Sequence, residues 1–401
     1  MDRRRFLFTL TAGDWPQFLG PARDGSAQEA GWGPGEFRVA WKKAVGAGFA
    51  GPVVSQGKLI IFHRIGGEEI VEAWDARSAA RLWAIPSPTR YRDDFGFDEG
   101  PRAAATVSGG RVFTQGAAGM LEALDFATGK RLWSVATMEK YGVAKNFFGA
   151  AGSPVVHENL VLLNVGGRER AGIVAFDAAT GREVWRATND EASYSTGTIA
   201  PWNGKPHAFF LTRAGLVAVE VGTGKVVQQV RWRSRSSASV NAATPLVVGD
   251  EIFLSASYGT GATVLKMAGP VWKPLWASDD SLSNHYSTSV VNGGYLYGFH
   301  GRQEEGQAFR CVEWKTGKVM WSEEGFGAGT VTLVNGKFLL TAREDGELVW
   351  ASANPRKWEV LSRGRTLGGT VRSYPAVANG RVYLRNEREL TAVVSSSFAL
   401  P

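Results

Sequence analysis

Short apolar runs separated by polar turns follow one another along nearly the whole chain, and one kind of turn recurs. In its clearest copy, residues 123–133, an apolar run ends at Asp125, Thr128-Gly129 follow, and a second short run ends at Trp133. Short runs on both sides of a Gly-containing turn are typical of two antiparallel β-strands. No long stretch has helical periodicity, so the pattern predicts strands and little helix.

The turn has four further copies, and in each the acid and the last position are eight residues apart. They run from Asp177 to Trp185, from Glu313 to Trp321, from Asp75 to Trp83 with Ala79 in place of Gly, and from Glu220 to Gln228 without the tryptophan. We expect the acid to accept backbone N–H bonds and Gly to take a positive φ. Each Trp should pack against a neighbouring unit. The turn and packing residues expected on this basis are Trp41, Trp83, Asp125, Gly129, Trp133, Asp177, Gly181, Trp185, Trp276, Gly317 and Trp321.

A second pattern precedes each turn: a small residue or Pro-Val, a Gly or Asn turn, and an apolar strand. It begins near residues 51, 105, 153, 198, 244, 288, 330 and 374. A repeat of about 45 residues has room for four short strands, which predicts an all-β, eight-bladed β-propeller over residues 37–401. The last repeat lacks a fourth strand, and the isolated strand 37–41 is expected to close the ring beside it. Two β-sandwiches are the alternative, but no linker divides the chain.

The residues before the propeller divide into two parts. Residues 1–13 contain Arg3-Arg4-Arg5 before a short apolar run, as in a twin-arginine export leader. The run is at the lower length limit of a signal peptide, so the alternative is a terminus that only resembles one. We expect an exported protein of the periplasm or cell envelope. Residues 14–36 are rich in turn residues, and Trp15 and Phe18 indicate a segment that docks onto the propeller.

Charge and motifs exclude several classes of function. The net charge is +7, of which the leader contributes +2, and the only basic cluster is residues 231–235, so a nucleic-acid partner is not expected. No segment is long and apolar enough to span a membrane. The histidines have no metal-ligand spacing. The acid pairs 93–94 and 279–280 are either solvated or bind a cation. We expect a monomer without catalytic or metal-binding residues.

The repeats, together with the segment from Asp14 to Gly25, resemble the PQQ-like propeller repeat family over about residues 14–397, and in particular its exported branch, similar to BamB. The resemblance is specific for the fold and weak for function. It implies two alternatives. One is a non-catalytic binding or scaffold protein of the envelope. The other is a PQQ-dependent oxidoreductase of the alcohol or sugar dehydrogenase type.

In quinoprotein alcohol dehydrogenases the quinone lies between a Trp and a disulfide of two adjacent cysteines, beside calcium and an Asp base. Cys311 is the only cysteine of this chain and lies in a strand pattern, where a small buried residue is expected. We therefore expect no cofactor, and PQQ with calcium remains the alternative. Polysaccharide binding by exposed tryptophans is a further possibility, but blade packing explains their spacing better.

In propellers of this family, the segments before each repeat start gather around one mouth of the central channel. Here these segments are polar and aromatic, as a small polar ligand or a peptide carboxylate would require. The alternative is that the polar groups satisfy one another and hold water. The residues predicted to bind a ligand or partner there are Arg92, Asp94, Arg102, Asn146, Tyr194, Asn241, Asn284, His285, Tyr286 and Arg372.

Overall fold

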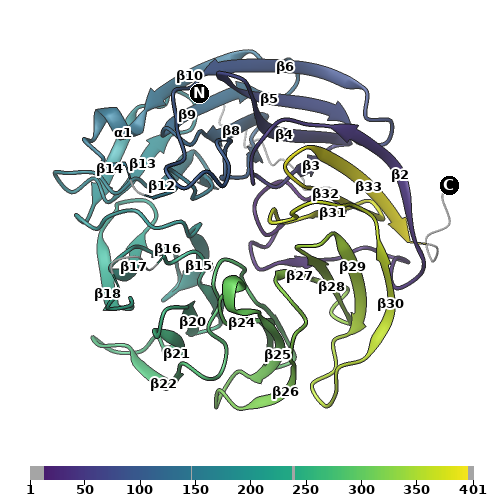
Figure 1. The fold of residues 1–401 in the computed structure, drawn as a ribbon. Helices are drawn as coiled ribbons and strands as arrows, with labels where there is room; N and C mark the ends of the chain where they lie inside the picture. The colour runs from purple at the N-terminus through teal and green to yellow at the C-terminus, as the bar shows by residue number, and fades with distance from the viewer. Residues whose placement is uncertain (1–12, 146, 237–239, 396–401) are drawn as a thin grey trace.

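Eight antiparallel sheets are arranged in a ring in the computed structural model, which describes residues 13–145, 147–236 and 240–395 (Figure 1). Seven sheets contain four consecutive strands of the chain, and one of these sheets has an additional strand. The eighth sheet contains three consecutive strands and one strand from the N-terminal region. The sequence-based prediction of an eight-bladed, all-β propeller is therefore confirmed. The predicted leader, residues 1–13, lies almost entirely outside the described residues.

The first four blades contain residues 53–231. Their strands are β3 (Val53–Ser55), β4 (Lys58–Ile65), β5 (Glu68–Asp75) and β6 (Arg81–Pro88); β7 (Thr106–Ser108), β8 (Arg111–Gln115), β9 (Met120–Asp125) and β10 (Arg131–Ala136); β11 (Val155–His157), β12 (Leu160–Asn164), β13 (Ile173–Asp177) and β14 (Glu183–Ala187); β15 (Thr198–Trp202), β16 (Lys205–Leu211), β17 (Gly215–Glu220) and β18 (Val226–Arg231). A short helix, α1 (Thr137–Lys140), follows the second blade.

The last four blades contain residues 246–395 and one strand from the N-terminal region. Their strands are β19 (Leu246–Val248), β20 (Glu251–Ala256), β21 (Gly261–Lys266) and β22 (Lys273–Ser278); β23 (Val290–Asn292), β24 (Tyr295–His300), β25 (Ala308–Glu313) and β26 (Val319–Glu323); β27 (Gly329–Val334), β28 (Phe338–Arg343), β29 (Glu347–Ser352) and β30 (Val360–Arg365); β31 (Ala376–Ala378), β32 (Arg381–Arg385), β33 (Glu389–Ser395) and β2 (Phe37–Ala44). A 3₁₀ turn, η1 (Gln303–Glu305), joins β24 to β25.

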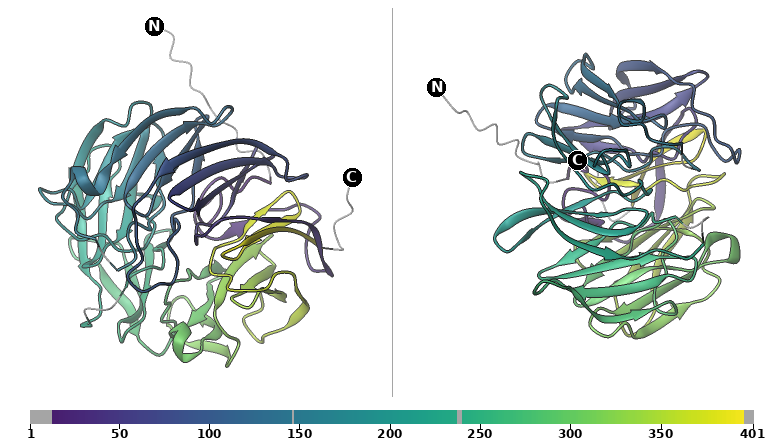
Figure 2. Two further views of the ribbon diagram at one scale, coloured as in Figure 1. Left: turned by 45° about the horizontal axis from the view of Figure 1, so that its top comes forward. Right: turned by 90° about the vertical axis from the view of Figure 1, so that its left-hand side faces the viewer.

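The eighth blade is built from both ends of the chain. β2 pairs antiparallel with β33, so that Phe37 lies opposite Ser395 and Ala44 opposite Glu389. Figures 1 and 2 show the purple β2 beside the yellow β33. The isolated strand therefore closes the ring, as the sequence predicts.

The recurring turn connects the third and fourth strands of a blade and packs against the neighbouring blade. Asp125 Oδ1 accepts bonds from the N–H and the Oγ of Thr128, and Gly129 has φ +77°. A Cβ on Gly129 would lie 2.8 Å from the Trp83 ring of the preceding blade, and Trp83 Nε1 donates to the Phe126 carbonyl. The predicted packing of Trp against a neighbouring unit is confirmed.

The same contact recurs around the ring. Indole N–H groups donate to the carbonyl in the next turn for Trp41 to Ala76, Trp133 to Ala178, Trp185 to Val221, Trp276 to Trp314 and Trp321 to Asn354. In the copy without a tryptophan, the Gln228 side chain donates to the Pro270 carbonyl instead.

Successive strands of a blade run in opposite directions, so the two ends of the ring differ. The innermost strand leads away from the loop that joins two blades, the second returns, and the third leads away again. The Thr-Gly turns therefore lie at one end of the ring, which we call the turn face. The loops between blades lie at the other end, which we call the mouth face.

Residues 14–34 cross the axis at the turn face, and Figure 1 shows this purple segment running from the centre of the ring toward β2. Trp15 pairs with Val54, the Pro16 carbonyl accepts a bond from Val107, and Arg23 donates to the Val156 carbonyl. A two-residue strand, β1 (Ser26–Ala27), then runs parallel to β27. These contacts extend from the first three blades across to the seventh, so the segment covers the end of the channel.

Glu29 fixes the second half of this segment. Its carboxylate oxygens accept the backbone N–H groups of Asn379 and Gly380 in the turn between β31 and β32. Burial raises the pKa of Glu29, and the two backbone bonds lower it by less. Within the described residues, no helix combines the length and hydropathy needed to cross a membrane.

Candidate functional site: a cavity at the mouth of the ring

The loops between blades meet around a cavity of about 240 Å³, which we call the mouth cavity. Every junction between blades contributes except the one between β26 and β27. The turns after β20 and β24 also reach it. It is lined by Phe18, Phe49, Gly51, Phe97, Arg102, Phe148, Ala151, Ser153, Tyr194, Thr196, Val240, Ala242, Tyr258, His285, Tyr286, Gln303, Glu304, Arg372 and Tyr374.

Arg372, in the junction before β31, is the cation with most hydrogen-bonding capacity toward the cavity. Its Nε donates to Glu344 Oε1 at 2.9 Å, and the Tyr286 hydroxyl donates to the same oxygen at 3.0 Å. The guanidinium lies 5.7 Å from the Phe49 ring centroid and 5.8 Å from that of Phe97. Its terminal nitrogens have no acceptor among the described residues. Glu344 therefore orients the group and leaves its outer N–H groups available.

Arg102 is held more tightly on the adjacent wall. Its side chain donates to the carbonyls of Gly100 and Asp98 and to Asp93 Oδ2. The guanidinium also lies 5.4 Å from the Tyr91 ring centroid. Asp93 in turn accepts backbone N–H bonds from its own loop, so it is a structural acid. The sequence left open whether Asp93 is solvated or binds a cation. In the structure its carboxylate accepts bonds from backbone N–H groups and from Arg102.

Neutral polar groups complete the wall opposite Phe97. Tyr258 Oη lies 3.0 Å from His285 Nε2, and the Nδ1 atom of His285 is buried without a partner among the described residues. Burial lowers the pKa of His285, so the imidazole is neutral near pH 7. Glu304 borders the same side and pairs with Arg302 at 3.5 Å. Two ion pairs, Arg302–Glu304 and Arg372–Glu344, thus contribute side chains to the cavity.

Five aromatic residues, two of them exposed, cluster beside the cavity. Phe95 and Phe97 are 52% and 57% exposed, and their ring centroids lie 5.5 and 6.1 Å from that of Phe148. Phe148 also packs on Tyr194 at 5.4 Å. We call Phe95, Phe97, Phe147, Phe148 and Tyr194 the aromatic rim. Clustered exposed rings of this kind mark interaction sites more often than single exposed apolar residues do.

The floor of the cavity comes from the N-terminal segment. The Phe18 ring packs edge-on against Tyr374 at 4.8 Å, and the Tyr374 hydroxyl bonds the backbone of Thr288. Because residues 14–34 cover the opposite end of the channel, the cavity opens only at the mouth face.

The structure brings five of the predicted site residues to the cavity: Arg102, Tyr194, His285, Tyr286 and Arg372. It places Asn241 and Asn284 behind the wall, where their side-chain amides donate to the backbone carbonyls of Thr212 and Phe299. Asp94 is exposed and pairs with Lys145. Asn146 lies outside the described residues. A polar residue in a junction can therefore either face the cavity or fix the loop, and sequence alone does not distinguish these roles.

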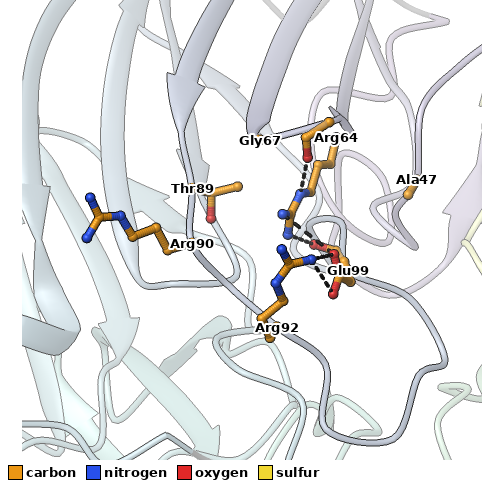
Figure 3. Close-up of a pocket in the computed structure, with 8 residues that line it drawn as sticks. Ala47, Arg64, Gly67, Thr89, Arg90, Arg92 and Glu99 are labelled. Atoms are coloured by element: carbon orange, nitrogen blue, oxygen red, sulfur yellow. Dashed lines mark hydrogen bonds and ion pairs between the residues drawn. The ribbon is translucent and has the colours of Figure 1, made fainter.

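Arg92 lies at a separate, open hollow of about 600 Å³ beside the first blade (Figure 3). Figure 3 shows Arg64 and Arg92 converging on Glu99, while Arg90 points away. Arg64 also donates to the carbonyls of Gly66, Tyr91 and Glu99. Arg64 and Arg92 therefore hold the loop of residues 89–99 through Glu99.

Sequence reasoning missed Phe49, Tyr258 and Glu304 as lining residues. Phe49 lies in the junction before the first full repeat, so the rule that junctions line the mouth could have identified it. Tyr258 and Glu304 come from turns within blades, after β20 and β24, and only the three-dimensional arrangement brings them to the mouth.

The residues of the cavity do not fit the quinone site implied by the family resemblance. Cys311 is buried in β25, inside a blade, where burial raises the pKa of its thiol to about 12. No tryptophan lines the cavity. Within residues 13–145, 147–236 and 240–395, no three His, Cys, Asp or Glu side chains gather as a metal site requires. Among the described residues of the cavity, the stacking partners and metal ligands of a quinoprotein centre therefore have no counterpart.

Comparisons with known proteins point to two related groups. The family model described as "Outer membrane protein assembly factor BamB" matches residues 32–147 and 67–323. BamB of Shewanella oneidensis is 23% identical over 383 residues, which cover 89% of this chain and 88% of that protein. Quinohemoprotein alcohol dehydrogenase ADH-IIG of Pseudomonas putida is 33% identical over 141 residues, 34% of this chain. The chain spans only 19% of the length of that dehydrogenase.

Two solved structures have the same fold. BamB from Moraxella catarrhalis matches with a TM-score of 0.65 and 17% identity, over 90% of this chain and all of that one. Quinohemoprotein alcohol dehydrogenase from Comamonas testosteroni matches with a TM-score of 0.69 and 15% identity, over 97% and 81% of the two chains. At these identities the likeness concerns the fold alone.

Proposed function

Because the chain belongs to the family of outer membrane protein assembly factor BamB, we propose that it is a non-catalytic scaffold of the bacterial envelope that holds a partner at its mouth face. The mouth cavity and the aromatic rim are the observation that carries this proposal. They combine exposed aromatic surface with an oriented guanidinium, which is the composition of protein-binding hot spots. The turn face, in contrast, is occupied by residues 14–34 of the chain itself.

The relatives supply the setting of the proposal. The matched BamB proteins are named as factors of outer membrane protein assembly. A partner in the same process, recognised through the rim, is the function we infer for this chain. An envelope location follows from that inference and agrees with the expectation from the leader.

Site-specific photo-crosslinking tests the proposal. A photoreactive phenylalanine analogue at Phe97 is expected to capture one discrete protein in cells that naturally express the chain. The same analogue at Val184, which is 49% exposed on the outer strand β14, is the matched control. Equal capture from both positions, or capture from neither, would contradict a partner site at the mouth face.

A quinone-dependent oxidoreductase is the second candidate, favoured by the 33% identity to a quinohemoprotein dehydrogenase over about a third of the chain. Calorimetric titration with pyrroloquinoline quinone, with and without calcium, tests it directly. We expect no saturable binding, because the cavity has neither a paired cysteine nor a tryptophan wall. Tight binding with calcium, followed by dye reduction with an alcohol or sugar, would replace our proposal.

A further inference from the structure

The mouth cavity has the features of a site for one chemical class of ligand. We infer that it binds a carboxylate attached to a single aromatic ring, with Arg372 holding the carboxylate and the phenylalanines of the mouth enclosing the ring. The inference rests on the proposed binding function of this site and specifies what is bound.

The state of Arg372 provides the first argument. Of the Arg372 nitrogens, only Nε donates to Glu344. The two terminal nitrogens of Arg372 therefore keep their N–H donors in the planar arrangement that matches a carboxylate. The side chain is 24% exposed, so an anion bound there is partly removed from water. Charge-assisted bonds are stronger in such a setting than on an open surface. The Tyr286–Glu344–Arg372 contacts fix the guanidinium before any ligand arrives.

The walls provide the second argument. The ring centroids of Phe49 and Phe97 lie 5.7 and 5.8 Å from the guanidinium, and Phe148, Tyr194 and Tyr374 continue the aromatic lining. An apolar ring is what such walls accommodate best. The volume of about 240 Å³ is below the roughly 300–1,000 Å³ of sites for drug-sized ligands, which restricts the occupant to about one ring with a short stem.

The charges around the cavity favour a single negative charge. Glu344 lies against Arg372, and Glu304, which pairs with Arg302, also lines the cavity. A dianion such as a phosphate ester would place two negative charges near these carboxylates. A ligand carboxylate places only one negative charge there and pairs it with Arg372. Arg102 pairs with Asp93, and its terminal nitrogens already donate to the carbonyls of Gly100 and Asp98, so it does not bind a second charge.

The same chemistry has two sources, a free aromatic acid and the C-terminal aromatic residue of a protein. The cavity opens toward the aromatic rim, so a chain could leave it across Phe95 and Phe147. A C-terminal residue with the rim contacting the residues before it would bind more tightly than the free acid. The test therefore includes both.

Calorimetric titration of the full chain with matched probes tests the inference. The probes are 3-phenylpropionate, N-acetylphenylalanine, N-acetylphenylalanine amide, phenyl phosphate, and a hexapeptide ending in phenylalanine as free acid or amide. We expect saturable binding of every aromatic carboxylate, and affinities about tenfold to a hundredfold weaker for the amides, which lack the charged partner of Arg372. Tighter binding of the acid hexapeptide than of N-acetylphenylalanine identifies the chain end as the source, and equal binding identifies the free acid.

Variants connect binding to the named residues. Arg372→Gln is expected to lower the affinity for the carboxylate probes about tenfold or more and to leave the affinity for the amides unchanged. Phe97→Ala should weaken all probes about threefold to tenfold without affecting folding, since Phe97 is largely exposed. Arg365→Gln, an exposed arginine on β30 paired with Asp345, is the matched control and should change nothing.

Equal affinity for acid and amide, stronger binding of phenyl phosphate, or an unchanged affinity in Arg372→Gln would overturn the inference. The absence of binding for all probes up to about 10 mM would overturn it as well. If crosslinking at Phe97 still captures a partner in that case, the scaffold function stands and only the ligand class is wrong.

Discussion

The two faces of the ring are built on different rules. At the turn face, one short pattern is repeated with the same hydrogen bonds, as in the pairs Trp133–Ala178 and Trp185–Val221. At the mouth face, the side chains that line the cavity differ from junction to junction and come from distant parts of the sequence. The contacts that stabilise the ring therefore recur at regular intervals along the chain. The residues of the binding surface come from segments that do not repeat, and the fold brings them together.

The largest effect is expected at the seams of the turn face. Trp185 is buried, its ring packs on Gly224, and its Nε1 donates to the Val221 carbonyl at 2.9 Å. Trp185→Ala should lower the free energy of unfolding by about 3–5 kcal/mol, measured by urea denaturation. Val184→Ala, at the exposed neighbouring position, is the control. A loss below about 1 kcal/mol would show that the seams do not determine stability.

Acid should weaken the closure of the ring next to the mouth. His63 Nδ1 accepts the Gly46 N–H, and burial, followed by the charge of Arg385, lowers the pKa of His63 to about 4. The folded state keeps this imidazole neutral while the unfolded chain binds a proton below about pH 6.5. Stability is therefore fully present above pH 6.5 and decreases as the pH falls to about 4, by about 3 kcal/mol.

Urea denaturation at several pH values measures this loss. His63→Gln does not titrate and should have a shallower dependence on pH. His285 and His300, whose pKa values burial also lowers, keep part of the slope. An identical slope in the variant would mean that His63 is not the group responsible.

The segment that covers the turn face should contribute less. Glu29→Ala leaves the N–H groups of Asn379 and Gly380 without their acceptor. We expect a loss of about 1–3 kcal/mol in the free energy of unfolding. Hydrogen exchange should be faster at these two amides and unchanged at the mouth face. Faster exchange around Tyr374 as well would mean that the two faces are coupled through Phe18.

A change in one turn should be stabilising. Ala79 occupies the position of Gly in the other turns and has φ +56°. Ala79→Gly relieves that conformation and should raise the free energy of unfolding by about 1 kcal/mol. The reverse change, Gly181→Ala, should destabilise more than this, because a Cβ there would lie 2.6 Å from Trp133. A lower stability for Ala79→Gly would contradict the strain at this turn.

The smallest effect on stability is expected at the aromatic rim. Phe97→Ala should change the free energy of unfolding by less than about 0.5 kcal/mol, because more than half of the side chain is exposed. Thermal denaturation measures this, with Trp185→Ala as the reference. A large loss would assign the rim a structural role and weaken its interpretation as a binding surface.

The fold could be predicted from the sequence because most blades repeat the same turn and the same contact with the neighbouring blade. Asp125, Gly129 and Trp133 each have one role, and that role depends on neighbours a fixed distance away in the chain. The same reasoning identified β2 as the strand that completes the eighth blade.

The site could be predicted only in part. The junctions were the right segments, but whether a residue such as Asn284 or Arg372 faces the cavity depends on the loop conformation. Asn284 satisfies the carbonyl of Phe299 in its own blade, while Arg372 is turned inward by Glu344 of the preceding blade. Such contacts between blades leave no periodic signal in the sequence.

The pairing of β2 with β33 also has a consequence for biosynthesis. Phe37 lies opposite Ser395, so β2 leaves the ribosome about 350 residues before the strand that it pairs with. At about 5–20 residues per second, β2 spends roughly 20–70 s without its partner. A chain that stops before Glu389 leaves open strand edges on both sides of the gap, and such edges pair readily with other chains. The ring thus depends on translation through Ser395, since only a polypeptide that contains β33 can complete it.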